Sequence, residues 1–196
     1  NIMSNNNLFQ DQLLHSLQYG FIDREIFQEG VYSPKILIND TETHRYVLND
    51  IQEELSKAKS FAFSVAFITQ SGLALIKSQL SDLADEGIQG RILISPYLDF
   101  NDPIAMKELL KLENVQVRIT PVNMQMHAKF YLFEQKDKQV IISGSSNLTH
   151  TALKINYEWN VKLTSTHNGD FIQNAKEEFE RIWKKSNVLN IEAINA

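Results

Sequence analysis

The sequence predicts an α/β domain in which a mixed β-sheet is sandwiched between helices. The chain of 196 residues is long enough for one sizeable core, and 43% hydrophobic with 22% charged residues is a globular composition. From residue 35 onward, helix and strand patterns alternate, and two hairpin-like strands follow them, which favours this fold class. We expect an N-terminal arm over residues 1–34, the domain over residues 35–188 and a tail over residues 189–196.

The arm opens with polar residues 1–7, which we expect to be disordered or foreign to the native chain, with Met3 as the native start. One short helix is predicted by the apolar residues Leu8, Leu13, Leu14 and Leu17. Gly20 and residues 30–34 then break regular structure.

The first half of the domain alternates strands and helices. A strand at 36–38 precedes a helix marked by apolar residues at helical spacing, namely Val47, Leu48, Ile51 and Leu55. Residues 61–68 are apolar at nearly every position, as in a strand covered on both faces. A helix over 72–84 and a strand over 91–95 follow. Asp102 with Pro103 predicts a helix start, and we expect that helix to end near Asn114.

The second half is richer in strands. We expect them at 115–119, 127–133, 140–143 and 158–163. A final amphipathic helix over 171–184 has a core face of Phe179, Ile182 and Trp183 and a solvated face of Glu177, Glu178 and Glu180.

Composition excludes several classes of protein. The absence of cysteine excludes a disulfide framework, cysteine-ligated zinc, iron–sulfur clusters and a thiol nucleophile, and we expect a cytoplasmic protein. The longest apolar stretch, residues 62–68, is far shorter than the roughly 20 residues of a membrane-spanning helix. A net charge of -5 disfavours a broad basic face, so any phosphate-binding site is expected to be local.

His127 and Lys129 are the first candidates for a reactive site. Residues two apart on a strand point to the same face, which places an imidazole beside a fixed positive charge. An imidazole can act as a nucleophile or an acid near neutral pH, and a lysine ammonium suits an anionic phosphate oxygen. A solvated hairpin strand without a catalytic role would show the same pair of residues.

Two further segments complete the candidate site. Gly144-Ser145-Ser146-Asn147 follows an apolar strand, and its backbone N–H groups and small side chains can surround an anion. Glu158 shares a strand face with Asn160, and its carboxylate can hold a histidine ring by the second nitrogen. The structural alternatives are a turn with a helix cap, and a solvated Glu158 beside a core Trp159.

In this order, these segments resemble the phospholipase D superfamily, whose signature is HxK, an acidic or amide residue about four positions later, and a GSxN-like turn. The residues that match the signature are His127, Lys129, Gly144, Ser145 and Asn147, and Glu158 matches the downstream glutamate of the nuclease branch. Glu134 stands where the family most often has aspartate. Its odd spacing from His127 predicts the opposite strand face, so we assign it no catalytic role. The resemblance covers about residues 36–184.

A narrower resemblance is to the N-terminal nuclease-like domain of certain bacterial superfamily II helicases. Four runs carry it: residues 37–40 (LIND), 63–69 (FSVAFIT), 144–149 (GSSNLT) and 156–160 (NYEWN). A motor domain follows in those proteins, but this chain has no Gly-rich, lysine-containing phosphate loop. The resemblance therefore implies an isolated domain or a piece of a longer helicase, with residues 189–196 leading toward the missing domain.

The superfamily resemblance implies a metal-independent phosphodiesterase without a cofactor, most simply a nuclease acting on DNA or RNA. Two HxK units share each active site in the superfamily: one histidine forms a phosphohistidine and the other protonates the leaving oxygen. This chain has one such unit, so a homodimer with His127 of each copy at the two-fold axis is implied. Lys129 and Asn147 would bind the non-bridging oxygens, Ser145 would add a donor, and Glu158 would orient His127.

Further basic residues, two alternative functions and one alternative metal site complete the predictions. Lys154 is expected to bind substrate, and additional nucleic-acid contacts are expected from Lys136, Lys138 and Arg118. One alternative is a non-catalytic nucleic-acid-binding module of a helicase, and another is a phospholipase-type hydrolase or transferase, although those enzymes generally carry two motifs in one chain. A metal site of His127, His150 and Glu158 is disfavoured because no fixed ligand spacing supports it.

Overall fold

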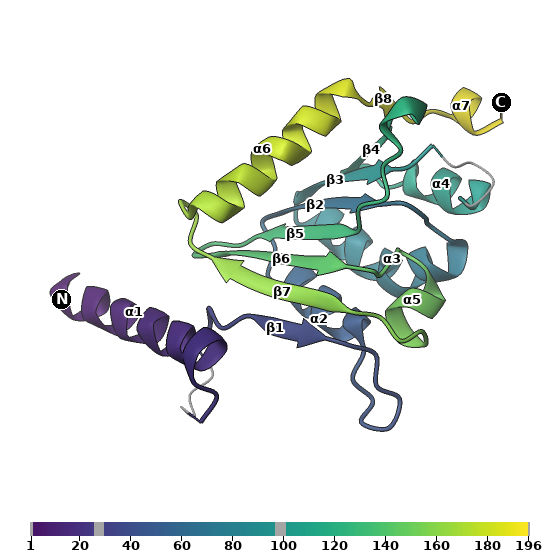
Figure 1. The fold of residues 1–196 in the computed structure, drawn as a ribbon. Helices are drawn as coiled ribbons and strands as arrows, with labels where there is room; N and C mark the ends of the chain where they lie inside the picture. The colour runs from purple at the N-terminus through teal and green to yellow at the C-terminus, as the bar shows by residue number, and fades with distance from the viewer. Residues whose placement is uncertain (1, 26–29, 97–100, 196) are drawn as a thin grey trace.

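A mixed β-sheet of eight strands forms the centre of the fold (Figure 1), with the order β1-β7-β6-β5-β2-β3-β4-β8. This computed structural model describes residues 2–25, 30–96 and 101–195, with side chains from residue 7 onward. The strands are β1 (Lys35–Leu37), β2 (Ser60–Val65), β3 (Gln89–Ile94), β4 (Val115–Ile119), β5 (Phe130–Glu134), β6 (Gln139–Gly144), β7 (Asn160–Ser165) and β8 (Asn187–Val188). The helices are α1 (Ile2–Leu17), α2 (Val47–Leu55), α3 (Gln70–Asp85), α4 (Pro103–Leu109), α5 (His150–Lys154), α6 (Asp170–Lys185) and α7 (Ile191–Asn195), with a π-helix η1 (Gln18–Ile22) and a 3-10 helix η3 (Val122–Met124).

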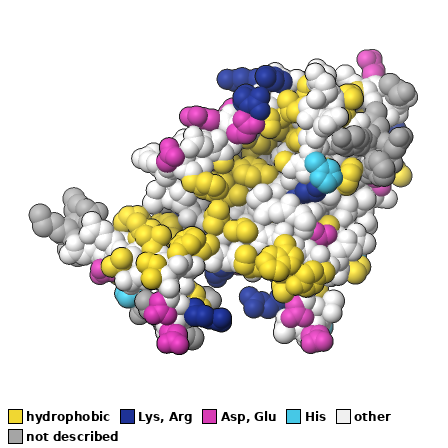
Figure 2. All heavy atoms as spheres, in the orientation of Figure 1, with side chains coloured by type: hydrophobic (Ala, Val, Ile, Leu, Met, Phe, Trp, Pro, Cys, Tyr) yellow, Lys and Arg dark blue, Asp and Glu magenta, His cyan; other side chains and the backbone are white. Residues whose placement is uncertain are grey.

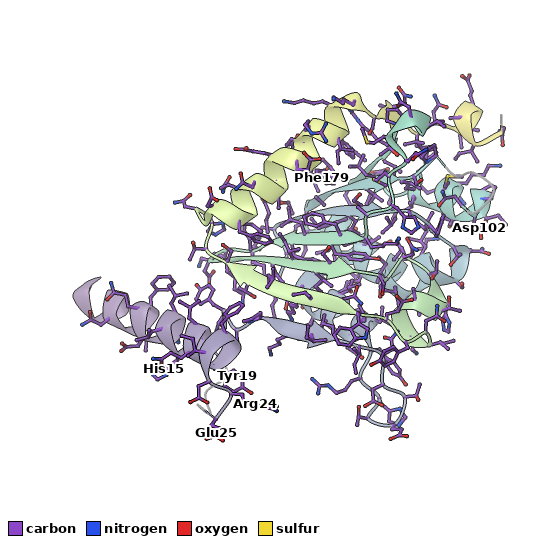
Figure 3. All side chains as sticks on the ribbon, in the orientation of Figure 1. His15, Tyr19, Arg24, Glu25, Asp102 and Phe179 are labelled. Atoms are coloured by element: carbon purple, nitrogen blue, oxygen red, sulfur yellow. The ribbon has the colours of Figure 1, made fainter. Side chains whose placement is uncertain are left out.

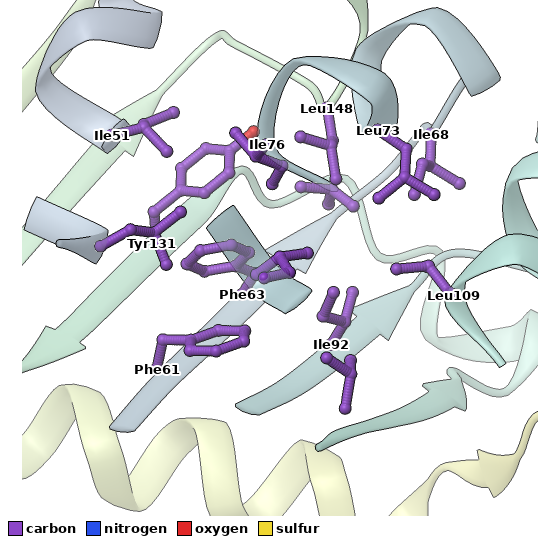
Figure 4. Close-up of a cluster of buried hydrophobic side chains, with 14 of the residues drawn as sticks. Ile51, Phe61, Phe63, Ile68, Leu73, Ile76, Ile92, Leu109, Tyr131 and Leu148 are labelled. Atoms are coloured by element: carbon purple, nitrogen blue, oxygen red, sulfur yellow. The ribbon is translucent and has the colours of Figure 1, made fainter. Parts of the chain in front are cut away.

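Helices cover both faces of the sheet, which confirms the predicted fold class. Helices α2, α3, α4 and α5 pack on one face, around the fully buried ring of Phe63, which lies 5.0 Å from that of Tyr131 (Figure 4). Helix α6 covers the other face, where Phe179 (Figure 3) and Trp183 belong to one buried cluster with Leu93. Of the predicted core face, Phe179 and Trp183 are buried and Ile182 is partly buried, and Ile172 is buried with them.

The directions of the strands bring four chain segments to one edge of the sheet. Strands β2, β3 and β4 are parallel, whereas β5, β6 and β7 are successively antiparallel. Phe130 at the start of β5 therefore pairs with Ser64 near the end of β2. In the same way, Gly144 at the end of β6 pairs with Asn160 at the start of β7. The segments after β2, before β5, after β6 and before β7 consequently meet.

Two strands begin later than the sequence predicts. Strand β5 begins at Phe130 and β7 at Asn160, so His127, Lys129 and Glu158 precede the strands instead of lying on them. Pairing of β5 with β2 stops at Phe130 because β2 ends at Val65, and the chain after β2 then turns to contact the segment after β6. The candidate residues thus occupy the loops at the sheet edge.

Helix α4 begins as predicted and ends early. The side chain of Asp102 accepts a hydrogen bond from Ile104 N at 2.8 Å, with Pro103 in the first turn (Figure 3). The helix ends at Leu109 instead of near Asn114. Asn114 is buried and donates from Nδ2 to the carbonyls of Leu80 and Ile88, at 3.3 and 2.8 Å. These bonds hold Asn114 in the turn before β4.

Both ends of the chain are more regular than predicted. Helix α1 begins at Ile2, because residues 2–7 contain no proline or glycine that would stop the helix, and it projects from the sheet (Figure 1). At the other end, Leu189 is 2% exposed and its N–H donates to Val117 O at 3.0 Å. Packing therefore continues beyond residue 188, the predicted end of the domain. None of the described helices combines the length and the hydropathy needed to cross a membrane.

Candidate active site

The sequence-predicted residues of the HxK, GSxN and downstream glutamate segments lie at the sheet edge described above. His127 and Lys129 immediately precede β5, Ser145 and Asn147 follow β6, and Glu158 precedes β7. A glycine makes this convergence possible. A Cβ added at Gly144 would lie 2.1 Å from Trp159 O and 2.6 Å from Asn160 Cα, so only glycine allows β6 and β7 to approach here.

His127 is exposed and contacts a buried lysine. Lys129, which is 7% exposed, places Nζ 2.7 Å from His127 Nδ1 and donates to His127 O at 2.8 Å. An ammonium can only donate, so the ring nitrogen that faces Lys129 accepts. Phe67 packs against the ring in an edge-to-face contact, with centroids 5.8 Å apart. A solvent-accessible imidazole is thus held between an aromatic ring and a cation.

Burial and a nearby carboxylate shift the pKa of Lys129 in opposite directions. Removal from water lowers the pKa of the Lys129 ammonium, and the negative charge of Glu158 partly offsets that effect. Burial also raises the pKa of the Tyr131 phenol, with a smaller contribution from Glu158. The Tyr131 hydroxyl donates to Ser146 O at 2.9 Å. Glu158 is therefore the negative charge that balances the buried cation of the site.

Ser145 holds Glu158 in place. The buried carboxylate of Glu158 accepts hydrogen bonds from Ser145 Oγ and, at 3.4 Å, from Asn156 Nδ2. Ser145 Oγ itself accepts from Trp159 N at 3.0 Å. The serine proton is therefore directed at Glu158 and not at a substrate. Both Glu158 and His127 are described, and no hydrogen bond joins them, so the expected orienting contact is absent from this arrangement.

Asn147 joins two segments through one half of its amide. Its Oδ1 accepts hydrogen bonds from Ala66 N at 3.1 Å and from Phe67 N at 3.0 Å. These bonds fix the loop after β2, which carries the aromatic neighbour of His127. The donor half of the amide, Nδ2, takes no part in these two bonds.

The turn after β6 does not surround an anion with backbone N–H groups, contrary to the sequence-based expectation. Ser145 N donates to Trp159 O at 3.0 Å, and Ser146 N donates to Asn160 Oδ1 at 3.3 Å. Gly144 N donates to Lys129 O at 3.2 Å. These donors are used within the fold, because the turn must connect β6, β7 and the segment before β5.

Several predicted contacts lie elsewhere. Lys136 and Lys138 occupy the turn at the far end of β5, roughly 20 Å from Lys129 at the usual rise per strand residue. Arg118 donates to Trp183 O at 2.8 Å and stacks on that indole. The structure does not bring these residues to the site. Lys136 and Lys138 lie in the turn between β5 and β6, and Arg118 is held by its contacts with Trp183.

Lys154 and Glu134 also have structural partners. Lys154 ends α5, and its ammonium lies over the Tyr46 ring, 5.4 Å from the centroid. Its predicted contact with substrate stays a prediction. Glu134, which received no catalytic role, ends β5 and pairs with Lys176 of α6. Within the described ranges, no cluster of three or more His, Cys, Asp or Glu residues could hold a metal ion, so His127, His150 and Glu158 do not form the alternative set.

Sequence reasoning missed Asn39, which positions the loop that carries Glu158. Asn39 is buried, and its Nδ2 donates to Ala152 O and Asn156 O, each at 2.8 Å. Its Oδ1 accepts from Val47 N at 3.0 Å. An asparagine directly after a short apolar strand was the available signal, and it does not by itself indicate which segments the amide joins.

Trp159 is the second surprise. The structural alternative placed this indole in the core with Glu158 in solvent, but Trp159 is 57% exposed and Glu158 is 9% exposed. The inward position of the carboxylate turns the indole outward, because neighbouring residues of an extended segment point to opposite sides. Hydrophobicity alone predicted the reverse.

Comparison with known proteins adds independent information. The family described as "Cardiolipin synthase, PLD-like domain" matches residues 51–183. Mitochondrial cardiolipin hydrolase from Homo sapiens is 39% identical over 79 residues, which is 40% of this chain. That match spans 29% of the length of the human protein.

Two solved structures share the fold. NucT from Helicobacter pylori has a TM-score of 0.66 and 19% identity, covering 81% of this chain and 99% of NucT. Nuc from Salmonella typhimurium, a phospholipase D family member, has a TM-score of 0.62 and 16% identity, covering 80% of this chain and 99% of Nuc. At these identities, the likeness establishes the architecture.

Proposed function

Because this chain belongs to the phospholipase D-like family, we propose that it hydrolyses phosphodiester bonds in DNA without a metal ion, with His127 as the nucleophile. One observation carries the proposal: an exposed imidazole lies 2.7 Å from the ammonium of a buried lysine, beside a buried carboxylate. A nucleophile and an anion-binding cation in contact are the minimum that attack on phosphorus requires.

The reaction has two steps. In the first, a ring nitrogen of His127 attacks phosphorus and forms a P–N bond. The P–O bond to the leaving nucleoside breaks, and that oxygen takes a proton from His127 of the partner subunit. In the second, water attacks phosphorus, its proton passes to the same partner imidazole, and the P–N bond breaks. The products are one alcohol and one phosphomonoester.

The side chains around His127 have distinct roles in these steps. Lys129 and the Nδ2 of Asn147 donate to the non-bridging oxygens, where charge accumulates in the transition state. Those anionic oxygens are better acceptors than a neutral imidazole, so substrate draws the ammonium away from the ring and frees the ring nitrogen. Glu158, held by Ser145, keeps a negative charge close to Lys129 and favours its protonated form.

A homodimer supplies the second imidazole. The sequence contains a single HxK unit, and His127 is exposed, so a second copy can approach it. A two-fold axis at the site would bring two His127 and two Lys129 side chains together. We further propose a helicase-associated, cytoplasmic context, which rests on the four sequence runs of the narrower resemblance.

A second candidate is hydrolysis of a phospholipid diester. The observation that favours it is the identity shared with a cardiolipin hydrolase over 79 residues. The chemistry at phosphorus is the same, so the substrate distinguishes the two candidates. A third possibility, binding of DNA without cleavage, predicts retention of DNA without turnover.

The test uses plasmid DNA, single-stranded DNA and cardiolipin vesicles, each incubated with the protein in EDTA. We expect DNA cleavage that persists in EDTA and disappears in His127→Ala. The matched control is His44→Asn, because His44 is exposed and asparagine tolerates its positive φ of 55°. Cleavage that EDTA abolishes or that survives in His127→Ala refutes the mechanism. Turnover of cardiolipin without cleavage of DNA would show that the substrate is a phospholipid and not DNA. An active monomer refutes the shared site.

A further inference from the structure

Two aromatic side chains project into solvent beside the candidate active site. Tyr157 is 72% exposed and Trp159 is 57% exposed, while Glu158 between them is turned inward. The other tryptophan, Trp183, is 6% exposed and stacks on Phe179 in the core. Exposed aromatic rings on a soluble protein often mark surfaces that contact another molecule. The position of this pair next to a reactive centre suggests contact with the substrate.

The segment that carries the two rings is held at both ends. Trp159 donates from its N–H to Ser145 Oγ, and its carbonyl accepts from Ser145 N, both at 3.0 Å. On the other side, the carbonyl of Asn156 accepts from the buried amide of Asn39 at 2.8 Å. The backbone is therefore fixed to the same serine that holds Glu158. Rings on a preorganised backbone lose little freedom when they bind a ligand.

The lysines that flank this pair in the chain already have partners: Lys154 lies over the Tyr46 ring, and Lys162 forms ion pairs with Asp50 and Glu54. The net charge of the chain is -5, and residues 155–161 include no lysine or arginine. Figure 2 shows hydrophobic side chains across much of the face that it draws, with Lys and Arg side chains mostly at its margins. A substrate that extends beyond one phosphodiester therefore needs non-ionic contacts. The π-faces of unpaired bases supply such contacts to exposed aromatic rings.

We propose that Trp159, with Tyr157 beside it, stacks on an unpaired base of a single-stranded nucleic acid whose phosphodiester lies at His127. This inference rests on the proposed function and adds a preference for single strands to it. Duplex DNA covers both faces of each base with its neighbours, so it cannot offer a free π-face without local melting. An anionic membrane surface is the less favourable ligand, because such surfaces attract basic segments and residues 155–161 contain no lysine or arginine.

The test compares strands of equal charge that differ in their bases. A single-stranded oligonucleotide and an abasic strand of the same length are titrated into protein carrying His127→Asn, which prevents turnover. We expect Trp159→Ala to weaken oligonucleotide binding by about 5- to 150-fold and to leave abasic binding unchanged. Trp159→Phe should retain most of the affinity. The control Phe171→Ala removes a ring that is 53% exposed at the start of α6, and it should change neither.

Cleavage assays separate failure of this inference from failure of the proposed function. If protein with His127 intact cleaves neither strand, the proposed function is wrong. If this protein cleaves both strands and Trp159→Ala cleaves the oligonucleotide at the same rate, stacking is refuted while the proposed function stands. Sedimentation and vesicle binding complete the set. Loss of the dimer in Trp159→Ala would assign the Trp159 indole to the contact between copies. Loss of vesicle binding alone would assign the indole to a membrane contact. Either result overturns the inference.

Discussion

Replacement of Asn39 by alanine tests whether a buried amide holds the loop that carries Glu158. The variant removes three hydrogen bonds of 2.8, 2.8 and 3.0 Å, to Ala152 O, Asn156 O and Val47 N. Each is worth about 1 kcal/mol net, and more where a buried partner stays unsatisfied. We therefore expect the free energy of unfolding to fall by about 3 kcal/mol, which lowers Tm by about 6–12 °C in a chain of this length.

Urea and thermal unfolding measure this effect, with Asn174→Ala as the control. Asn174 is exposed and makes one hydrogen bond, to Asp170 at 3.0 Å, so its loss should cost less than about 0.5 kcal/mol. Asn39→Asp gives a sharper test. It keeps the acceptor for Val47 N but turns a carboxylate toward two carbonyl oxygens, so we expect a loss at neutral pH that shrinks as acid restores one donor. An Asn39→Ala protein as stable as the control would refute the reasoning.

Three further predictions concern the site itself. Burial lowers the pKa of Lys129, and Glu158 partly offsets this. Activity should therefore fall with rising pH at a lower pH than an ordinary lysine would give. In Glu158→Gln this fall should occur at a still lower pH, as profiles of kcat/KM against pH would record. Asn147→Asp keeps the acceptor for the N–H groups of residues 66 and 67 but places a carboxylate at the proposed phosphate position. Stability should therefore change by less than about 1 kcal/mol, while activity should fall by about 100-fold. Equal losses in unfolding and turnover assays would contradict the separate roles of Oδ1 and Nδ2. Gly144→Ala places a Cβ 2.1 Å from Trp159 O and should cost more than about 3 kcal/mol in urea unfolding; unchanged stability would disprove the tight approach of β6 and β7.

The helix and strand boundaries that could be predicted from sequence are those determined by residues within the element itself. Strand β4 occupies the predicted residues 115–119, and α4 starts at the predicted Asp102 cap, because apolar spacing and local hydrogen bonds act over a few residues. The early end of α4 could not be predicted in this way. It depends on Asn114 reaching carbonyls of residues 80 and 88, which only the folded chain brings near.

The same distinction separates the parts of the candidate site. The residue types of the site were visible in the sequence, since His127 and Lys129 are two residues apart. The spatial arrangement of these residues could not be predicted to the same extent. Asn147 binds the backbone of residues 66 and 67, about 80 positions earlier, and the outward turn of Trp159 follows from the burial of its neighbour. Such long-range hydrogen bonds leave no period or spacing in the sequence.

The antiparallel order of β5, β6 and β7 has a practical consequence. Residues 127–165 run from the loop before β5 through β6 to the end of β7. The loops that carry the candidate site residues meet at one edge of the sheet, and the turn at Lys136 and Asp137 is exposed at the opposite edge. A fluorophore, an affinity tag or an inserted domain placed in that turn would extend away from the reactive loops. The fold thereby offers a handle for immobilising or labelling the protein with its chemistry intact.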